Sequence, residues 1–335
     1  MTLLPAGKLD PETLRKLLSR YTRKGGGVII GADIGEDAAV IDMGPVLLVA
    51  KTDPVTHATS AIGRYAVHIN ANDIAAMGGT PRWYLATILM PPGTTADHVD
   101  LVFSQLSKSC EEIGVVYCGG HTEVTSSVNS PVVIGQMLGE VRRENLRPTS
   151  GAKEGDNLIM TKTGALEATA IIALEKAGEL IGRFPEDLVV KAQRYLHEPG
   201  ISVLQEARLL EGIAGIHAFH DPTEGGLATG IFEMAEASNL GVMVYEDRIP
   251  FTAETRALCN HYGINPLGAF ASGSLLMAVS SQDSREIMDI LDSANIQATC
   301  IGKLVKREEG LRLMTGGEIH ALPVFYQDEL SKIFG

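Results

Sequence analysis

The sequence predicts a two-domain protein of the α+β class, and three observations carry this prediction. The chain has 335 residues, more than the roughly 100–200 residues of one typical domain. Helix-like and strand-like apolar patterns follow one another along its length. Near the middle, a polar stretch with Pro148, Gly151 and Gly155 interrupts these patterns, as is typical of a connecting segment. We therefore expect an N-terminal domain over residues 1–147 and a C-terminal domain over residues 148–335.

The first half is expected to form a sheet accompanied by three helices. Asp10 and Pro11 suit the N-cap and first position of a helix, and the Gly25-Gly26-Gly27 run follows it. Helical spacing of apolar residues predicts helices over 11–21, 62–77 and 96–113. Short apolar runs between turn residues predict strands over 28–30, 38–41, 46–50, 83–90, 115–118 and 132–138.

The second half shows the same two kinds of pattern. Apolar runs predict strands over 157–161, 242–245, 274–279 and 299–304. Helical spacing predicts helices over 166–176, 185–196, 202–211 and 226–237. The chain carries neither a dinucleotide-binding G-x-G-x-x-G after its first strand nor a G-x-x-x-x-G-K-[ST] loop. Any phosphate site must therefore be built in another way.

Composition narrows the class of protein. Apolar residues make up 45% and charged residues 21%, an ordinary globular balance. The net charge of −13 argues against nucleic acid as a main partner, since phosphate backbones select clusters of Lys and Arg. The sequence has no apolar run of about 18 residues, no secretory signal and no C-x-x-C pair among its four cysteines. We expect a cytoplasmic protein that binds neither membranes nor nucleic acids.

Four aspartates lie at positions from which carboxylates can converge on a metal ion. Asp37 lies in a turn between two strands, Asp53 ends an apolar strand, and Asp221 precedes a Gly-Gly turn into a helix. Asp73 interrupts an apolar helix without capping it, on the same face as Asn70. Separated carboxylates suit Mg²⁺, which takes one or two of them together with phosphate oxygens. Taken singly, each aspartate is more often a turn residue or a helix cap.

Other segments suggest phosphate contacts and catalytic side chains. Gly119 and Gly120 follow a strand and would let the backbone approach a phosphate, with His121 projecting beside them. A tight turn with a hydrogen-bonded histidine explains the same residues. Lys162 lies just before a helix, whose N-terminus favours anions. With His57, which follows the second aspartate motif, His121 and Lys162 are our candidates for catalysis.

The order and spacing of these segments carry a resemblance to a known family. The segments are G-E-D-A-A-V followed by T-D-P-V, then N-D-I-A-A-M-G-G-T-P-R, G-G-H-T-E-V and D-P-T-E-G-G-L-A. Together they resemble the aminoimidazole ribonucleotide (AIR) synthase superfamily, or PurM-like proteins, in the branch of the hydrogenase-maturation protein HypE. The superfamily also contains thiamine-monophosphate kinase and selenophosphate synthetase. The similarity extends over nearly the whole chain.

The resemblance implies a two-domain homodimer that pairs through its N-terminal domains and binds ATP with Mg²⁺ near that interface. It assigns metal binding to the four aspartates, Asp37, Asp53, Asp73 and Asp221. It places a further set of residues near the nucleotide: Lys51, Thr52, Gly119, Gly120 and Thr122. Phosphoryl transfer depends mainly on positioning and charge neutralisation, which metals and backbone amides provide.

Three departures from the family pattern bear on the substrate. No cysteine follows Cys300, whereas HypE ends in a tail with a terminal cysteine, so we do not expect the HypE reaction. His121 stands where related kinases carry a metal-binding aspartate, with Glu123 as the nearest replacement, which leaves the number of metals open. Glu224 replaces the arginine of the HypE D-P-T-R-G-G motif and indicates a different substrate.

The sequence therefore favours an ATP- and Mg²⁺-dependent enzyme that phosphorylates or activates a small-molecule acceptor. A kinase of the thiamine-phosphate type is a second interpretation, and the missing aspartate counts against it. A nucleotide-binding regulatory or maturation protein without turnover is a third. The sequence does not identify the acceptor, because acceptor pockets depend on loops that carry no recognisable signature here.

Overall fold

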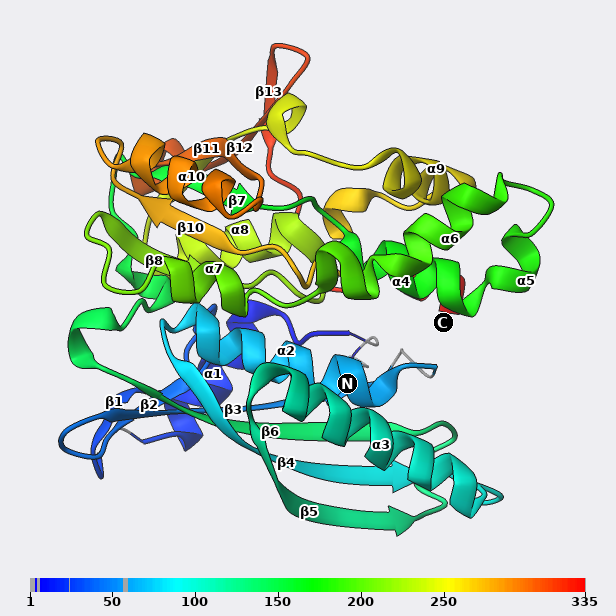
Figure 1. Cartoon of the computed structure of the whole chain (residues 1–335). Coiled ribbons are helices and arrows are strands. Elements are labelled where there is room, and N and C mark those ends of the chain that lie inside the picture. The colour runs from blue at the N-terminus through cyan, green and yellow to red at the C-terminus, as the bar shows by residue number, and fades with distance from the viewer. Residues whose placement is uncertain (1–3, 5–6, 24, 57–59, 335) are drawn as a thin grey trace.

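The computed structural model describes residue 4 and residues 7–23, 25–56 and 60–334. The predicted α+β class is confirmed. Each half of the chain builds one mixed sheet, and the two halves stack against each other (Figure 1). The segment between the sheets contains two short 3₁₀ turns, Arg143–Asn145 and Thr149–Gly151.

Among the described residues, the N-terminal sheet has six strands in the order β1-β2-β3-β6-β4-β5. These are β1 Val28–Ile30, β2 Ala39–Asp42, β3 Leu47–Val55, β4 Thr80–Met90, β5 Val116–Val124 and β6 Val132–Val141. Neighbouring strands are antiparallel except β4 and β5. Three helices accompany the sheet: α1 Pro11–Tyr21, α2 Ile62–Ala76 and α3 Ala96–Ile113.

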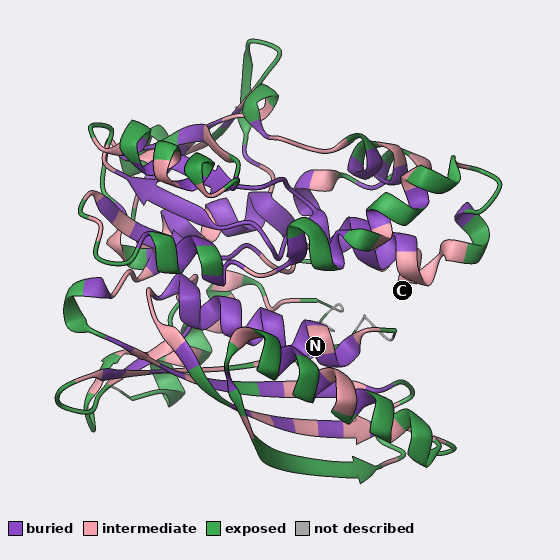
Figure 2. Ribbon diagram, viewed as in Figure 1, coloured by how far each residue is buried: buried purple, intermediate pink, exposed green. Residues whose placement is uncertain are grey.

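Helix α2 lies between the N-terminal sheet and the C-terminal half (Figures 1 and 2). Every residue of α2 except Arg64 is buried. Its N-terminal turn approaches α3 so closely that a Cβ on Gly63 would lie 2.7 Å from Cβ of Gln105. A helix with apolar residues on every side is expected to be enclosed by protein, which agrees with the sequence pattern of α2. It also means that the polar side chains of Asn70 and Asp73 are withdrawn from solvent.

The C-terminal sheet has seven strands within the described chain, in the order β13-β12-β9-β11-β7-β10-β8. These are β7 Asn157–Thr161, β8 Ile216–His220, β9 Gly241–Tyr245, β10 Leu276–Val279, β11 Ala298–Val305, β12 Leu311–Thr315 and β13 Glu318–Ala321. Neighbours are antiparallel except β9 and β12. The helices are α4 Leu166–Glu175, α5 Ala177–Leu180, α6 Glu186–Arg194, α7 Leu204–Leu209, α8 Gly226–Ala237, α9 Ala253–Tyr262, α10 Ser284–Ser293 and α11 Ser331–Phe334.

The C-terminal sheet is covered on both faces. Leu158 and Met160 of β7 pack with Leu227 and Ile231 of α8. Between them, Ile159 points the other way into a core that continues through α2 to the N-terminal sheet. The two halves are therefore joined by buried apolar surface. Within the described residues, no helix combines the length and apolar character that crossing a bilayer requires.

Strand β5 differs from the sequence prediction. We expected a strand over 115–118, with Gly119 and Gly120 after it either approaching a phosphate or forming a tight turn, but the strand continues to Val124. Gly120 adopts φ 146°, and a Cβ there would lie 1.8 Å from the carbonyl oxygen of Ala86 on β4. Glycine is needed at this position because the two backbones approach closely, not because the chain turns.

Candidate functional site

Three of the four predicted metal-binding aspartates converge where the two halves of the chain meet. Asp37 lies just before β2, Asp73 on α2, and Asp221 directly after β8. Each offers a carboxylate oxygen, and these oxygens all lie within 4.8 Å of one another. The three side chains are buried, with exposed fractions between 2 and 6%. Because two come from the N-terminal half and one from the C-terminal half, the cluster depends on how the halves pack.

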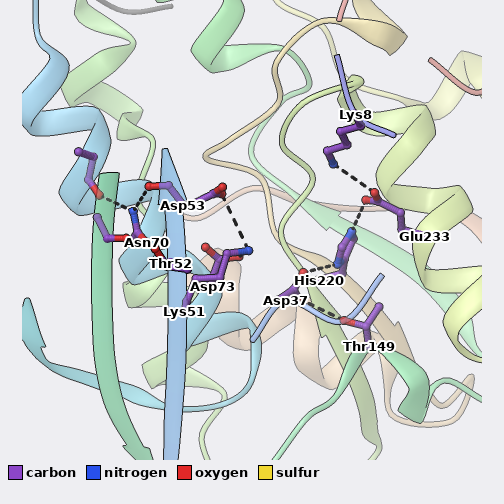
Figure 3. Close-up of polar contacts among 12 residues, drawn as sticks. Lys8, Asp37, Lys51, Thr52, Asp53, Asn70, Asp73, Thr149, His220 and Glu233 are labelled. Atoms are coloured by element: carbon purple, nitrogen blue, oxygen red, sulfur yellow. Dashed lines mark hydrogen bonds and ion pairs between the residues drawn. The ribbon is translucent and has the colours of Figure 1, made fainter. Parts of the chain in front are cut away.

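The fourth aspartate borders this cluster through a lysine. Lys51 and Asp53 lie two residues apart on β3 and so share one face of the sheet. Nζ of Lys51 lies 2.7 Å from Oδ1 of Asp73 and 3.9 Å from Oδ2 of Asp53 (Figure 3). Nδ2 of Asn70 donates to the Asp53 carbonyl at 3.3 Å and so ties β3 to α2. Asp53 is thus adjacent to the three converging carboxylates without being one of them.

The cluster is electrostatically costly without a bound cation. Burial raises the pKa of Asp73 to about 8, although Lys51 acts against this shift. Burial also raises the pKa of Asp221 well above its ordinary value, and Asp73 and Asp37 raise it further. Burial alone would lower the pKa of Lys51, but Asp73 and Asp53 outweigh it and raise that pKa. These are the shifts expected where carboxylates share a small space.

The donor set fits a magnesium ion. Oδ2 of Asp73 and both carboxylate oxygens of Asp221 are buried and have no hydrogen-bond partner among the described residues. Buried polar atoms are nearly always paired, so three orphaned oxygens at one place indicate a missing partner. All donors are oxygens, which Mg²⁺ prefers, whereas zinc and copper sites draw on sulfur and imidazole nitrogen.

A chain of ion pairs runs from Asp37 to the N-terminal segment (Figure 3). Nδ1 of His220 lies 2.7 Å from Oδ1 of Asp37, and Nε2 lies 3.2 Å from Oε2 of Glu233 on α8. Nζ of Lys8 lies 3.1 Å from Oε1 of Glu233. Thr149 donates to Oδ2 of Asp37 at 3.2 Å. Burial alone would lower the pKa of His220, but Asp37 and Glu233 raise it well above its ordinary value.

Sequence reasoning did not single out the supporting residues Lys8, Thr149 and Glu233. His220 was visible only as the residue before Asp221 in the H-D-P-T segment, and that adjacency is the one signal available for it. Lys8 and Glu233 are 225 residues apart in the chain, so no local pattern links them. They become partners only through the fold.

The nucleotide contacts predicted on β5 lie away from the carboxylates of the same chain. Gly119, Gly120 and Thr122 are exposed on this edge strand (Figure 2). The strand register aligns Gly120 with Asp53 across two intervening strands, a separation of about 14 Å at the usual strand spacing. Thr52 lies on the opposite face of β3 from Asp53 and donates to the carbonyl of β6 at Gly135, 2.9 Å away.

The three candidates for catalysis are not brought together. Nε2 of His121 lies 3.4 Å from Oε2 of Glu123, and both are exposed on β5. Lys162 lies in another cleft, where its Nζ is 2.7 Å from Oε1 of the buried Glu206. His57 lies outside the described residues. None of the described candidates contacts the aspartate cluster.

Two clefts adjoin the ion-pair chain. The first is lined by Lys8, Asp53 and Glu167 among others and encloses a cavity of about 130 Å³. The second lies between α1 and α8, has the apolar side chains of Leu14 and Phe232 in its wall, and encloses about 360 Å³. The second volume is in the range of small-molecule sites, whereas the first is smaller. Lys8 lines both clefts and so lies between them.

Comparison with known proteins connects this geometry to a family. Residues 35–141 match the model for the AIR synthase related protein N-terminal domain, and residues 153–313 match the C-terminal domain model. A putative hydrogenase expression/formation protein of Methanocaldococcus jannaschii is 28% identical over 330 residues and covers 95% of each chain. A selenide, water dikinase of Dechloromonas aromatica is 30% identical over 259 residues, covering 74% of this chain and 70% of that protein.

A solved structure shows the same fold. The crystal structure of hydrogenase maturation protein HypE in complex with ATP aligns with a TM-score of 0.69 at 23% identity. The alignment covers 89% of this chain and 90% of that one. The two domain models together account for most of the chain, in the order in which the two sheets occur. The protein therefore belongs to the AIR synthase related, PurM-like family, and HypE, selenide, water dikinase and their kin are its relatives.

Proposed function

We propose that this protein uses ATP and Mg²⁺ to transfer a phosphoryl group to a small-molecule acceptor, or to activate that acceptor. The observation that carries the proposal is the buried convergence of Asp37, Asp73 and Asp221, whose orphaned oxygens offer ligands to a cation. Its relatives support the same class of chemistry. One of them is named as a dikinase, and a solved neighbour of the same fold was crystallised with ATP.

The residues divide into ligands and supports. Asp37, Asp73 and Asp221 would hold the ion, and Mg²⁺ when bound supplies the positive charge that phosphate oxygens require. Lys51 holds Asp73 in place through its 2.7 Å contact and adds a second positive charge beside the cluster. His220 contacts Oδ1 of Asp37, and Thr149 donates a hydrogen bond to Oδ2. Together they orient the Asp37 carboxylate. Positioning and charge neutralisation are the main requirements of phosphoryl transfer.

The two clefts offer separate places for nucleotide and acceptor. The cleft between α1 and α8 has an apolar wall that includes Leu14, Phe232 and Phe325, which suits the flat face of a purine base. The cleft beside Asp53 then remains for the acceptor. In this arrangement the transferred phosphate lies between them, near the carboxylates and Lys51.

Pairing through the N-terminal domains into a homodimer is part of the proposal. Strand β5 ends the sheet, so one side of its backbone has no partner strand in this chain. Val116 and Val124 on this strand are 60 and 58% exposed. A second copy would cover them. It would also give the Gly119–Thr122 segment a route to a carboxylate cluster other than the distant one in its own chain.

Melting temperature tests the proposal. A ligand that binds only the folded protein, present at 100 times its dissociation constant, adds about 2.7 kcal/mol of stability. This corresponds to a rise of roughly 5–10 °C for domains of this size. We expect the rise to require ATP and Mg²⁺ together and to disappear with EDTA. A double substitution, Asp53→Asn with Asp73→Asn, should abolish it, whereas Asp97→Asn at the exposed start of α3 should not.

The same experiment separates the alternatives. No shift with any nucleotide would remove the proposed function and leave the fold assignment in place. A shift with Mg²⁺ and ATP but no ADP release with any acceptor would favour a regulatory or maturation protein without turnover. ADP release that depends on thiamine phosphate would favour a kinase of that type.

A further inference from the structure

The cleft beside Asp53, which we call the acceptor cleft, has a wall that Mg²⁺ and ATP do not explain. We define it by six of its lining residues: Lys8, Asp53, Glu167, Glu224, Phe270 and Ser272. Asp53 faces the carboxylate cluster, but Glu167 on α4 and Ser272 before β10 come from the C-terminal half. Their chemistry indicates what the cleft binds.

Glu167 is a buried acid whose carboxylate has few contacts that would stabilise its negative charge. Its side chain is 3% exposed, and its Oε2 accepts one hydrogen bond, from the backbone N–H of Ser272 at 3.3 Å. Burial raises the pKa of Glu167 to about 7, although that hydrogen bond acts against the rise. Asp328 and Asp53 raise it further. A positively charged group beside Glu167 would remove this cost.

Ser272 supplies an independent observation. Its residue is fully buried, at 0% exposed, yet its Oγ has no hydrogen-bond partner among the described residues. A buried hydroxyl without a partner is unfavourable. Ser272 lines the same cleft as Glu167, so one bound group can satisfy both. An acidic cluster alone would not imply a ligand, but an acid and an unpaired hydroxyl on one wall do.

The charged side chains of the cleft determine whether it favours a positively or a negatively charged ligand. Three carboxylates line it, those of Asp53, Glu167 and Glu224. Nζ of Lys51 lies 3.9 Å from Oδ2 of Asp53. Burial alone would lower the pKa of Lys8, but its partner Glu233 and also Glu224 raise it. Glu167 is the carboxylate of this wall that forms no ion pair among the described residues. A phosphate or carboxylate on the ligand would be repelled from this wall, whereas a cation would be attracted.

We propose that the acceptor cleft binds its small molecule through a positively charged nitrogen group, an amine or an amidine. Glu167 and Ser272 hold this group, and an apolar part of the molecule lies against Ile69, Ile171 and Phe270, which complete the cleft wall. The inference rests on the proposed function in one respect, namely that this molecule is the acceptor. The charged nitrogen serves for recognition, since a protonated amine has no lone pair with which to accept a phosphoryl group.

Matched aromatic probes test the charge preference directly. Benzamidine and benzylamine carry the expected cation, whereas benzoate and phenyl phosphate place an anion on the same ring. Ligand-observed NMR titration of the full-length protein should show binding of the two cations and weaker or no binding of the two anions. Glu167→Gln keeps the shape of the side chain and removes its charge. It should weaken benzamidine binding at least about tenfold, because charge-assisted hydrogen bonds are the strong ones.

Two further variants complete the design. Ser272→Ala should weaken benzamidine binding several-fold without changing any charge, and it keeps the inference testable if Glu167→Gln does not fold. Glu308→Gln removes an acid from the exposed 3₁₀ turn Arg307–Glu309 and should leave binding unchanged. Tighter binding of the anions, no binding of the cations, or binding unaffected by Glu167→Gln and Ser272→Ala would each overturn the inference. Competition between ATP with Mg²⁺ and benzamidine would also overturn it, because the cleft would then belong to the nucleotide.

These outcomes are distinct from a failure of the proposed function. If ATP with Mg²⁺ gives no melting shift but benzamidine binding depends on Glu167, the proposed function fails and the preference of the cleft stands. If ATP with Mg²⁺ binds and no cationic probe does, the nucleotide site stands and the inference about the acceptor fails.

Discussion

Asp221→Asn should stabilise the metal-free protein and remove its response to ATP with Mg²⁺. The carboxylate of Asp221 is buried against those of Asp37 and Asp73, and neither of its oxygens has a hydrogen-bond partner among the described residues. This arrangement is unfavourable until a cation binds. An asparagine keeps the shape of the side chain but removes the repulsion. Its N–H groups can also donate to the neighbouring carboxylates.

The size of the effect follows from these contacts. A hydrogen bond to a charged group contributes about 1.5–3 kcal/mol. After the desolvation of the new amide, we expect a net gain of about 1–3 kcal/mol, which is a rise of roughly 3–10 °C in melting temperature. Burial raises the pKa of Asp221. An acid with a raised folded-state pKa costs nothing at low pH and more as the pH rises above the unfolded value of about 4. The gain should therefore be small at pH 4 and largest near pH 8.

Scanning calorimetry in EDTA and in ATP with Mg²⁺ measures both effects in one series. Asp156→Asn is the matched control, because Asp156 is also buried but is paired, with Oδ2 2.9 Å from Nδ1 of His217. We expect this control to lose stability in EDTA and to keep its ligand-induced shift. If Asp221→Asn loses stability in EDTA as the control does, or keeps the wild-type shift, the argument for a cation site at the three aspartates is refuted.

Three further substitutions test other parts of the structure. Gly120→Ala should cost about 3 kcal/mol in urea unfolding, because its Cβ would meet the backbone of β4, whereas Gly119→Ala has open space and should cost less. Glu206→Gln should cost about 3–5 kcal/mol by leaving Lys162 buried without its partner, with no change in the ATP and Mg²⁺ shift. His68→Leu should become more stabilising by about 2 kcal/mol between pH 7 and pH 5. Burial lowers the pKa of His68 to about 3, so the unfolded chain takes up a proton there that the folded chain does not.

Residues of the candidate site could be singled out from the sequence where a local pattern had only one good explanation. Asp73 was the strongest candidate because an acid in the middle of an apolar helix has no structural use as a cap. The structure places it on a helix buried on all sides, in contact with Lys51. The predicted helix over 96–113 has the observed bounds because Thr95 caps its start and Gly114 ends it in the left-handed conformation.

Predictions based on glycine were less secure. A pair of glycines marks a turn, a phosphate approach or a close contact between strands, and the local sequence does not distinguish these. At Gly120 the deciding fact is the position of Ala86, more than 30 residues away on the neighbouring strand. Strands β8, β12 and β13 and helices α9 and α10 were not predicted, although Thr252 caps the start of α9 and Gly263 ends it in the left-handed conformation. Lysine at 162 had a local reason to bind anions, but Glu206 neutralises it in the fold.

The position of the carboxylate cluster links the stability of the protein to its proposed chemistry. Asp37 and Asp73 come from the N-terminal half and Asp221 from the C-terminal half, and His220 joins the two halves through Asp37. Repulsion among the three acids opposes the apolar packing that holds the halves together, and a cation between them reverses that opposition. Binding of Mg²⁺ should therefore tighten the same interface that forms the acceptor cleft. In the metal-bound protein, the wall residue Glu167 on the C-terminal side should then be held in a fixed position relative to Asp53. We therefore expect the acceptor to bind more strongly to the metal-bound protein than to the metal-free one.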